Sequence, residues 1–580
     1  MRLCLWVLAV TIASVSFLAE TCFGEKPANS HAVLVVHGKV LDSSGMPVSD
    51  ATVLPYHNGK LFLSARQGAE AHRDYSTGRS GLFMIEVQAS VEKIKDGKWS
   101  LKITRPSFKP SELVPLAKIF DEGKDERGIR RLVAITQVSL IRYQGAAFWI
   151  ALIVLVAVYV LIAFDIVHRT LAAFLGATLI LVITHTFGHF TDAYKVLTYD
   201  QALHAVDWNV IFLLMGMMII VGVLKASGVF EWLAYKSYQV SGGRIFVLAT
   251  VLCLVTAVVS ALLDNVTTML LLTPITMELA VILGVSPFVF LIPELVASNF
   301  GGTATLIGDP PNIMIGSYAG LTFNDFVINL LPVVTCVIAA QIIYNKFYYG
   351  KDYAQAKVED VPKMISFLRE KYSISDRRLL TIGGTILIGV IIMFIFHGFF
   401  QMEVSVAALF GGAVIILLTK LDIVELFEKE VEWSSLVFFI MLFILVGGAE
   451  QTGILQAIAD WILKACNGNL TAAVLIILWV SGLASAIIDN IPYTATMLPI
   501  MLFLSRTIPG ADSGVLWWAL SLGACFGGNW TLIGASANVV TAGIAEKAGY
   551  KITFYEFLKQ ATPITLLSLI ISSIYLLVRY

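Results

Sequence analysis

Residues 260–274 read SALLDNVTTMLLLTP, and residues 485–499 read SAIIDNIPYTATMLP. Both stretches place an Asp-Asn pair inside an apolar segment, and Asp489 follows Asp264 by 225 residues. A second pair follows at nearly the same offset, because residues 300–312 read FGGTATLIGDPPN and residues 526–538 read FGGNWTLIGASAN. Two copies of one membrane unit are the simplest explanation, and duplications of this kind are typical of transporters.

The composition agrees with a membrane location. Hydrophobic residues make up 57% of the chain and charged residues 14%, and the mean hydropathy is +0.80. These values lie far from those of soluble domains and indicate a polytopic membrane protein. The net charge of −1 argues against a nucleic-acid partner, which would need a basic surface. The six cysteines are scattered and fit isolated packing thiols.

The chain begins with features of an export signal. Arg2 precedes an apolar run, and the small residues Cys22 and Gly24 follow it. Residues 1–24 are therefore expected to be either a cleaved signal peptide or an uncleaved signal anchor, since the run is just long enough to span a bilayer. Both alternatives export the segment that follows.

That segment, residues 25–145, is polar and rich in turns. Its alternating runs predict strands at residues 32–41, 51–56, 82–87 and 99–103. The stretch GKVLDSSGMPVSDATVLPY loosely resembles the carboxypeptidase regulatory-like β-sandwich. No paired carboxylates or nucleophile-base pair stand out, which favours a structural or partner-binding accessory domain.

Long apolar runs after residue 146 predict five membrane crossings in each copy. Repeat 1 covers residues 146–349, a cytoplasmic linker covers 350–378, and repeat 2 covers 379–580. The expected crossings are residues 147–166, 171–187, 209–224, 287–318 and 325–347, and then 379–396, 404–419, 434–448, 515–545 and 562–577. Amphipathic stretches at 225–238 and 450–464 are expected to lie along the interface.

Between the third and fourth crossings of each copy lies an apolar segment with the Asp-Asn pair near its middle, at residues 244–283 and 470–504. A polar pair facing lipid is costly, so each segment is expected to be a re-entrant hairpin with its tip at mid-depth. Five crossings is an odd number, so the second copy must be inverted relative to the first.

Basic residues give an independent prediction of orientation. Seventeen Lys and Arg fall in the predicted inner loops, whereas the predicted outer loops between crossings hold only Lys195, Lys464 and Arg506. The predicted fold is an all-α polytopic membrane protein with two inverted repeats, preceded by a small extracytoplasmic β-sandwich. We expect it in the bacterial cytoplasmic membrane with the amino-terminal domain outside.

The two motifs carry chemistry suited to a small cation. Hairpin tips leave backbone groups without helical partners, and these can bind an ion together with the Asp264 and Asp489 carboxylates. In the GDPPN stretch, Gly308 is expected to permit an unusual turn, and Pro310 and Pro311 remove amide donors, so this crossing should be a broken helix. Asp309 has no acidic counterpart in the second copy.

Plainer interpretations exist for each feature. The Asp-Asn pairs could be helix caps, and the GDPPN stretch an ordinary proline turn. His185 and His189 have the spacing of metal ligands, but without a third ligand they are expected to be interfacial. Asp207 and Glu432 each precede a Trp and are expected to be interface anchors.

A family resemblance rests on the same residues. The strings DNVTTMLLLTP, GGTATLIGDPPN, DNIPYTATMLP and GGNWTLIGASANVVTAGIAEKAGY resemble the ion transporter superfamily, in particular its P protein (pink-eyed dilution) branch. The superfamily includes arsenite pump subunits, sodium/proton antiporters and sodium-coupled dicarboxylate transporters. Structurally known relatives are commonly dimers, so the resemblance implies a homodimer.

The resemblance implies two pseudo-symmetric ion sites. The first would use Asp264, Asn265, Thr267, Gly308, Asp309 and Asn312, and the second Asp489, Asn490, Thr494, Gly534, Ser536 and Asn538. Sodium is expected at Asp264, Asn265, Asp309 and Asn312, and at Asp489, Asn490, Ser536 and Asn538. The dicarboxylate branch has Ser where this chain has the two tip aspartates, and fixed carboxylates would repel a dianion.

The sequence therefore predicts a secondary active transporter for sodium or protons, with no cofactor besides the coupling ion. The alternative is an anion transporter or channel for arsenite, chloride or carboxylates, with cations masking the acidic tips. A sensor whose outer domain binds a ligand is a third hypothesis. An enzyme is not expected, because no metal triad, nucleophile-base pair or phosphate-binding GxxxxGK[ST] motif stands out.

Overall fold

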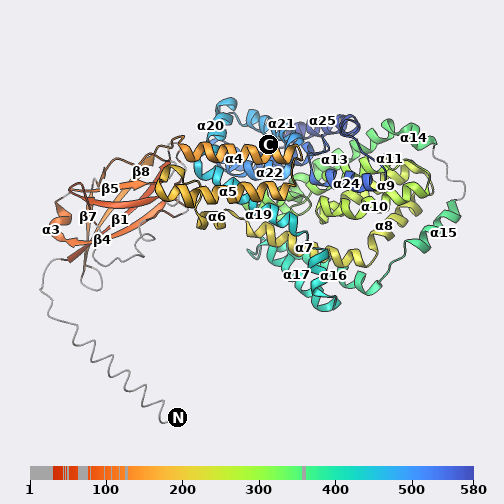
Figure 1. Cartoon of the computed structure of the whole chain (residues 1–580), viewed down its shortest axis with the longest axis horizontal. Coiled ribbons are helices and arrows are strands. Elements are labelled where there is room, and N and C mark those ends of the chain that lie inside the picture. The colour runs from red at the N-terminus through yellow and green to blue at the C-terminus, as the bar shows by residue number, and fades with distance from the viewer. Residues whose placement is uncertain are drawn as a thin grey trace, which may run out of the picture. The chain divides into compact units, whose positions relative to one another are not determined.

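The computed structural model describes residues 31–355 and 361–580, apart from residues 43–44, 46, 49–50, 63–75, 79, 97, 106–107, 117 and 125–128. The expected signal segment, residues 1–24, lies outside the described residues. The chain forms two compact units that divide between Tyr143 and Gln144 (Figure 1). The first unit is built mainly of strands and the second of helices.

Two four-stranded sheets make up the first unit, with the orders β4-β1-β8-β7 and β3-β2-β5-β6. β1 pairs antiparallel with β4 and parallel with β8. The strands are β1 (His31–Asp42), β2 (Thr52–His57), β3 (Lys60–Leu61), β4 (Leu82–Ser90), β5 (Trp99–Thr104), β6 (Val114–Pro115), β7 (Ile119–Lys124) and β8 (Arg130–Leu140), and the short helix α3 (Val91–Lys95) follows β4.

Side chains alternate between a shared core and the surface. Phe83, Ile85 and Val87 of β4 are buried with Trp99 of β5, whereas the residues between them in β4 are exposed. This alternation is why the four predicted strands are present and the predicted small sheet domain is confirmed. The strands β3, β6, β7 and β8 were not predicted. β7 is almost wholly exposed, and its IFDEGK sequence shows no alternation.

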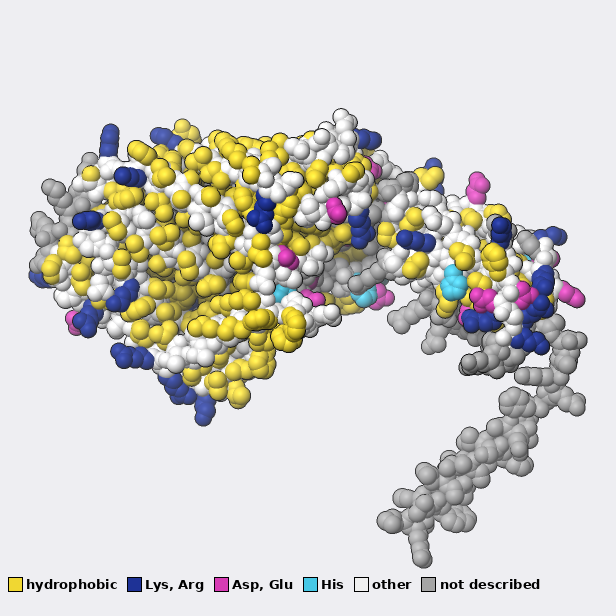
Figure 2. Space-filling view, turned by 180° about the vertical axis from the view of Figure 1, so that it is seen from behind, with side chains coloured by type: hydrophobic (Ala, Val, Ile, Leu, Met, Phe, Trp, Pro, Cys, Tyr) yellow, Lys and Arg dark blue, Asp and Glu magenta, His cyan; other side chains and the backbone are white. Residues whose placement is uncertain are grey.

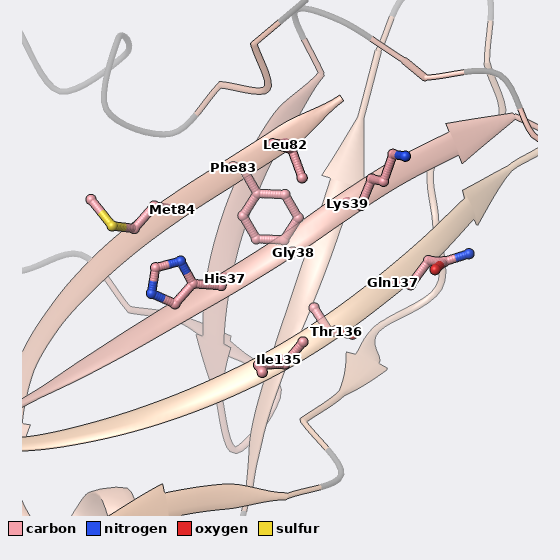
Figure 3. Close-up of a pocket in the computed structure, with 9 residues that line it drawn as sticks. All are labelled: His37, Gly38, Lys39, Leu82, Phe83, Met84, Ile135, Thr136 and Gln137. Atoms are coloured by element: carbon pink, nitrogen blue, oxygen red, sulfur yellow. The ribbon is translucent and has the colours of Figure 1, made fainter. Parts of the chain in front are cut away.

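A shallow concavity lies on the first sheet around Gly38 (Figure 3). A Cβ atom on Gly38 would lie 2.2 Å from Cζ of Phe83, so the glycine leaves the space that this ring needs. The lining residues come from β1, β4 and β8 and are His37, Gly38, Lys39, Leu82, Phe83, Met84, Ile135, Thr136 and Gln137.

The second unit consists of helices in an order that repeats. The first set is α4 (Ala146–Ala163), α5 (Arg169–Phe190), α6 (Tyr199–Ala205), α7 (Trp208–Ala226), α8 (Val229–Ser241), α9 (Ile245–Leu262), α10 (Asn265–Ile282), α11 (Phe288–Thr303), α12 (Pro310–Ala319) and α13 (Phe323–Tyr348). The linker holds α14 (Gly350–Gln355) and α15 (Val361–Lys371). The second set is α16 (Arg377–Phe396), α17 (Val404–Thr419), α18 (Ile423–Lys429), α19 (Trp433–Thr452), α20 (Ile454–Cys466), α21 (Leu470–Ile487), α22 (Asn490–Thr507), α23 (Val515–Gly527), α24 (Ser536–Lys547) and α25 (Phe554–Arg579).

Corresponding helices in the two sets match closely. The hairpin helices α9, α10, α21 and α22 each have 18 residues, and the last helices α13 and α25 each have 26. Gly228 and Gly453 join α7 to α8 and α19 to α20 in the left-handed conformation, with φ of 77° and 89°. The sequence duplication is therefore also a duplication of structural elements.

Ten described helices are long and apolar enough to cross a membrane, judged by length and composition. They are α4, α5, α7, α9, α10, α13, α16, α19, α21 and α25. Hydrophobic side chains cover much of the helical unit's visible face (Figure 2). The predicted amphipathic stretches began too early, because residues 225–226 end α7 and residues 450–452 end α19. The left-handed glycines set these boundaries.

The helices pack as two groups. The flanking group comprises α4, α5, α7, α16, α17 and α19, which contact one another as α4·α5, α5·α19, α4·α19, α7·α17, α16·α17 and α7·α16. The hairpin group comprises α9 to α13 and α21 to α25, with contacts that include α9·α11, α21·α23, α10·α24, α12·α22 and α13·α25. Contacts between the groups include α7·α12, α19·α22 and α13·α16.

Candidate functional site

The first Asp-Asn pair lies at the turn between α9 and α10. Asp264 is the N-cap of α10, and its carboxylate accepts hydrogen bonds from the backbone N–H of Thr267 at 2.9 Å and from the Thr267 hydroxyl at 2.5 Å. Among the described residues no basic side chain forms an ion pair with Asp264. Capping thus uses part of this carboxylate and leaves its charge without a basic partner.

The second pair lies at the turn between α21 and α22. Asp489 caps α22 by accepting from the Ile491 N–H at 3.1 Å, and it also accepts from the Ser536 hydroxyl at 2.6 Å. Arg169, the first residue of α5, lies 3.6 Å from the Asp489 carboxylate. Both tip aspartates therefore act as helix N-caps, but the two tips differ in charge balance.

The predicted broken helices are present in both copies. Residues 304–309 separate α11 from α12, and residues 528–535 separate α23 from α24. The Asn312 side-chain amide donates to the carbonyls of Thr303 and Thr305 at 3.0 and 2.9 Å. The Asn538 side-chain amide likewise donates to the carbonyls of Gly528 and Thr531, at 2.8 and 2.9 Å. Each asparagine satisfies carbonyl groups that the break removes from the helix.

Gly308 has a different role from the one expected. Its φ is not positive. A Cβ atom there would lie 2.5 Å from the Ser260 carbonyl oxygen and 2.6 Å from that of Gly302. Gly534 is similarly close to the Gly528 and Ser485 carbonyls, at 2.8 and 3.0 Å. Glycine is required because backbone segments approach closely, and not because the turn is left-handed.

The structure joins the two predicted residue sets into one network. The Asn490 side-chain amide lies 3.4 Å from the Asp309 carboxylate, so Asp309 faces the second tip rather than the first. The first tip connects to the second copy instead, because Asn265 donates to Asn299 at 2.9 Å and Asn299 donates to Asn538 at 3.2 Å. Helix packing explains the exchange, since α10 contacts α24 and α12 contacts α22.

Several members of this network were missed from sequence. Asn299 precedes the first FGG string and also donates to Asn529 at 2.8 Å. Ser521 donates to the Asn312 side-chain oxygen at 2.6 Å. Arg169 was counted only as an inner-loop charge. A buried amide on an otherwise apolar helix, as at Asn299, is the signal that could have identified the first of these.

Buried oxygen atoms near the tips lack partners among the described residues. These are the Asn265 side-chain oxygen and the hydroxyls of Thr268 and Thr494, on residues that are 2%, 0% and 0% exposed. Unpaired buried acceptors are costly, and amide and hydroxyl oxygens are ligands for hard cations. Thr267 was predicted as an ion ligand, but its hydroxyl donates a hydrogen bond to Asp264.

Negative charge gathers in the same region. Asp309 approaches the side chain of Asn490, the residue that directly follows Asp489. Asp309 is 0% exposed, and Asp489 is 5% exposed. Two buried carboxyl groups on neighbouring segments favour binding of protons or a small cation.

The other residues singled out from the sequence do not form a second candidate site among the described residues. Among the described residues no group of three or more His, Cys, Asp and Glu is arranged to hold a metal ion. His185 lies on the exposed surface of α5, where its Nδ1 is 2.9 Å from the Leu181 carbonyl oxygen. Asp207 caps α7 by accepting from the N–H groups of Asn209 and Val210.

Comparisons with known proteins give the family. Residues 159–523 match the citrate transporter family. An uncharacterized transporter of Mycobacterium tuberculosis is 43% identical over 433 residues, which cover 74% of this chain and 98% of that protein. The P proteins of Sus scrofa and Homo sapiens are 35% identical, and each match covers 74% of this chain and 59% or 60% of the P protein.

Among solved structures, the YdaH transporter of Alcanivorax borkumensis aligns with a TM-score of 0.48 and 16% identity, over 71% of this chain and 98% of that chain. The similarity to the P proteins confirms the resemblance drawn from the four motifs. The extent of the family match, together with the ten span-length helices, makes this an integral membrane protein. The chain therefore belongs to the citrate transporter family of membrane transporters.

Proposed function

We propose that this protein is a secondary active transporter that moves sodium ions, protons or both by alternating access at a site between two inverted repeats. The observation that carries the proposal is the set of Asp264 and Asp489 at the two tips and buried Asp309 beside the second tip, of which only Asp489 has a basic partner among the described residues. A cation or proton bound there would offset repulsion that the protein itself leaves uncompensated.

Reciprocal packing supports the inversion. In the repeated order, α4, α5, α7, α10 and α12 correspond to α16, α17, α19, α22 and α24. When each helix is replaced by its counterpart, the contact α10·α24 becomes α22·α12, α5·α19 becomes α17·α7, and α4·α19 becomes α16·α7. All of these contacts are present. A two-fold axis relating the copies produces such exchanged pairs, and an axis in the membrane plane would satisfy the odd number of crossings. The excess of basic residues in one set of loops favours the amino-terminal domain outside the bacterial cytoplasmic membrane. From the family resemblance, the working assembly is a homodimer.

The test is transport in proteoliposomes that contain a pH-sensitive dye. Wild-type protein should change the internal pH when a sodium gradient is imposed. Asp264→Asn should reduce this rate to less than one tenth, because the amide cannot supply the negative charge that the cation needs. Asp192→Asn, which alters an aspartate with a 78% exposed side chain, should leave the rate unchanged. A wild-type rate in Asp264→Asn would contradict the proposal.

An anion carrier with cation coupling is the second candidate. The family description and the position of Arg169, whose guanidinium contacts the Ser536 hydroxyl beside the second tip, favour it. Bound cations would then mask the tip carboxylates. Sodium-driven uptake of labelled citrate without sodium-dependent proton movement would favour this candidate over the first.

A further inference from the structure

Arg169 makes an unusual set of contacts for the first residue of a helix. Its guanidinium lies 3.6 Å from Asp489 and donates to the hydroxyls of Ser536 and, at 3.3 Å, Ser435. It also lies over the Phe438 ring, 5.3 Å from the centroid. The Arg169 side chain is 23% exposed and the Asp489 side chain 7%, so the pair is largely removed from solvent.

These contacts join the two helix groups. Arg169 begins α5 of the flanking group, and Ser435 and Phe438 belong to α19 of the same group. Asp489 and Ser536 belong to the hairpin group, at the start of α22 and of α24. The ion pair is therefore a charged link between groups that must move relative to one another if access alternates.

The link exists at only one of the two tips. Asp264, the counterpart of Asp489, has no ion-pair partner among the described residues. In the repeat, Pro310 stands where the second copy has Ser536, so the hydroxyl that Arg169 contacts is also missing from the first copy. Within the part of the chain that the structure describes, a basic side chain thus pairs with the second tip and not with the first.

Other ionisable groups around this tip do not replace Arg169. Asp309 lies just before α12 and approaches Asn490, and it carries the same sign of charge as Asp489. Tyr159 of α4 bonds to the Pro492 carbonyl and the Thr496 hydroxyl of α22. Glu432 is joined to Arg169 through Ser435, whose hydroxyl donates to Glu432 at 3.1 Å and accepts from Arg169 at 3.3 Å.

We infer that Arg169 is a tethered cation that occupies the second tip when no sodium ion is bound there, and that sodium must displace it to release the hairpin group from the flanking group. The inference rests on the proposed function, because it assigns a competitor to the proposed ion site. A sodium ion beside Asp489 would repel the guanidinium, and both cannot use the same carboxylate oxygens. Arg169 therefore acts on the site by competing with sodium for the Asp489 carboxylate.

The experiment measures sodium binding and transport on the full-length protein. Sodium-dependent thermal stabilisation in detergent gives the half-saturating concentration, and proteoliposomes give the same quantity together with the maximal rate. Arg169→Gln should lower the half-saturating sodium concentration about tenfold, the smallest effect that removal of a close opposite charge usually has. The variant should also have a lower maximal transport rate, because the Arg169 guanidinium is no longer present to displace sodium from Asp489 and so speed its release.

Matched variants separate competition from simple structural support. Arg169→Lys keeps the charge and should stay near the wild-type half-saturation. Lys225→Gln removes a basic residue that pairs with Glu430, just before α19, at 3.1 Å, and it should change neither quantity. In an Asp489→Asn background, Arg169→Gln should no longer alter half-saturation, because the carboxylate for which the two cations compete is gone.

The outcomes distinguish this inference from the proposed function. A sodium response in the wild type with unchanged or raised half-saturation in Arg169→Gln would overturn the inference and leave the proposed function standing. A lower maximal rate alone would indicate a structural link without competition, and would also overturn it. If sodium changes neither the thermal stability nor the transport rate of the wild type, both the inference and the proposal that the protein moves sodium are contradicted.

Discussion

At the scale of single residues, the geometry of the site depends on glycines that let backbone segments approach closely, as well as on the charged aspartates. Gly308 and Gly534 let the broken helices approach the carbonyls of α9 and α21. Asn312 and Asn538 then satisfy the carbonyls that each break exposes. In each break two carbonyl groups are held by an asparagine side chain, which gives the break a defined conformation.

Gly308→Ala should destabilise the protein by about 1–3 kcal/mol and abolish transport, because its Cβ would meet backbone oxygens that cannot rotate away. Gly384→Ala in α16 is the matched control, since no atom lies within 4 Å of a Cβ there. That change should be neutral or stabilising by up to about 1 kcal/mol. Thermal unfolding of the purified variants measures both effects, and equal stability of the two variants would contradict the close-approach explanation.

At the scale of elements, the repeats exchange partners. Each hairpin contacts the broken helix of the other copy, through α10 with α24 and α12 with α22. The hairpin group is therefore held together across the duplication, whereas it contacts the flanking group at fewer helix pairs. Relative movement should occur between the two groups and not between the two copies.

Paired cysteines test where the movement occurs. Thr273 of α10 and Thr541 of α24 have hydroxyls 3.4 Å apart within the hairpin group. Asn209 of α7 and Ser317 of α12 lie 3.2 Å apart between the groups. A disulfide in Thr273→Cys/Thr541→Cys should leave transport intact, whereas one in Asn209→Cys/Ser317→Cys should block it until reduced.

Gel mobility measures disulfide formation, and proteoliposome flux before and after reduction measures its effect. The single substitutions serve as controls for each pair. Full transport in the oxidised Asn209→Cys/Ser317→Cys protein would mean that these two groups do not separate during the cycle.

At the scale of the whole molecule, the chain combines a strand unit with a duplicated helical unit, and the described site residues all lie in the second. If the copies are inverted as proposed, equivalent loops lie on opposite sides of the membrane. The loop between α5 and α6 and the loop segment at α18 are such a pair, because each lies between the second and third long helices of its copy.

Cysteine labelling in intact cells tests this placement. Asp192→Cys and Lys429→Cys lie at positions whose native side chains are 78% and 67% exposed. A membrane-impermeant maleimide should label Asp192→Cys at once and Lys429→Cys only after permeabilisation. The protein without either substitution gives the background, and labelling of both positions from one side would contradict the inversion.

The sequence alone determined the membrane class, the duplication, the two Asp-Asn turns and both helix breaks. The membrane class follows from hydropathy, the first break from the backbone limits of Pro310 and Pro311, and the second break from its repetition of the first motif. All of these are local properties that a linear chain displays. It also determined the four strands whose buried and exposed residues alternate.

Only the tertiary structure decided which segments meet. It placed Asp309 beside Asn490, 181 residues away, and Arg169 beside Ser536, 367 residues away. It also showed that Gly308 is required by a backbone contact and not by its own torsion angle. Contacts over such separations depend on how all the helices of the unit pack together, and no local pattern in either repeat encodes that packing.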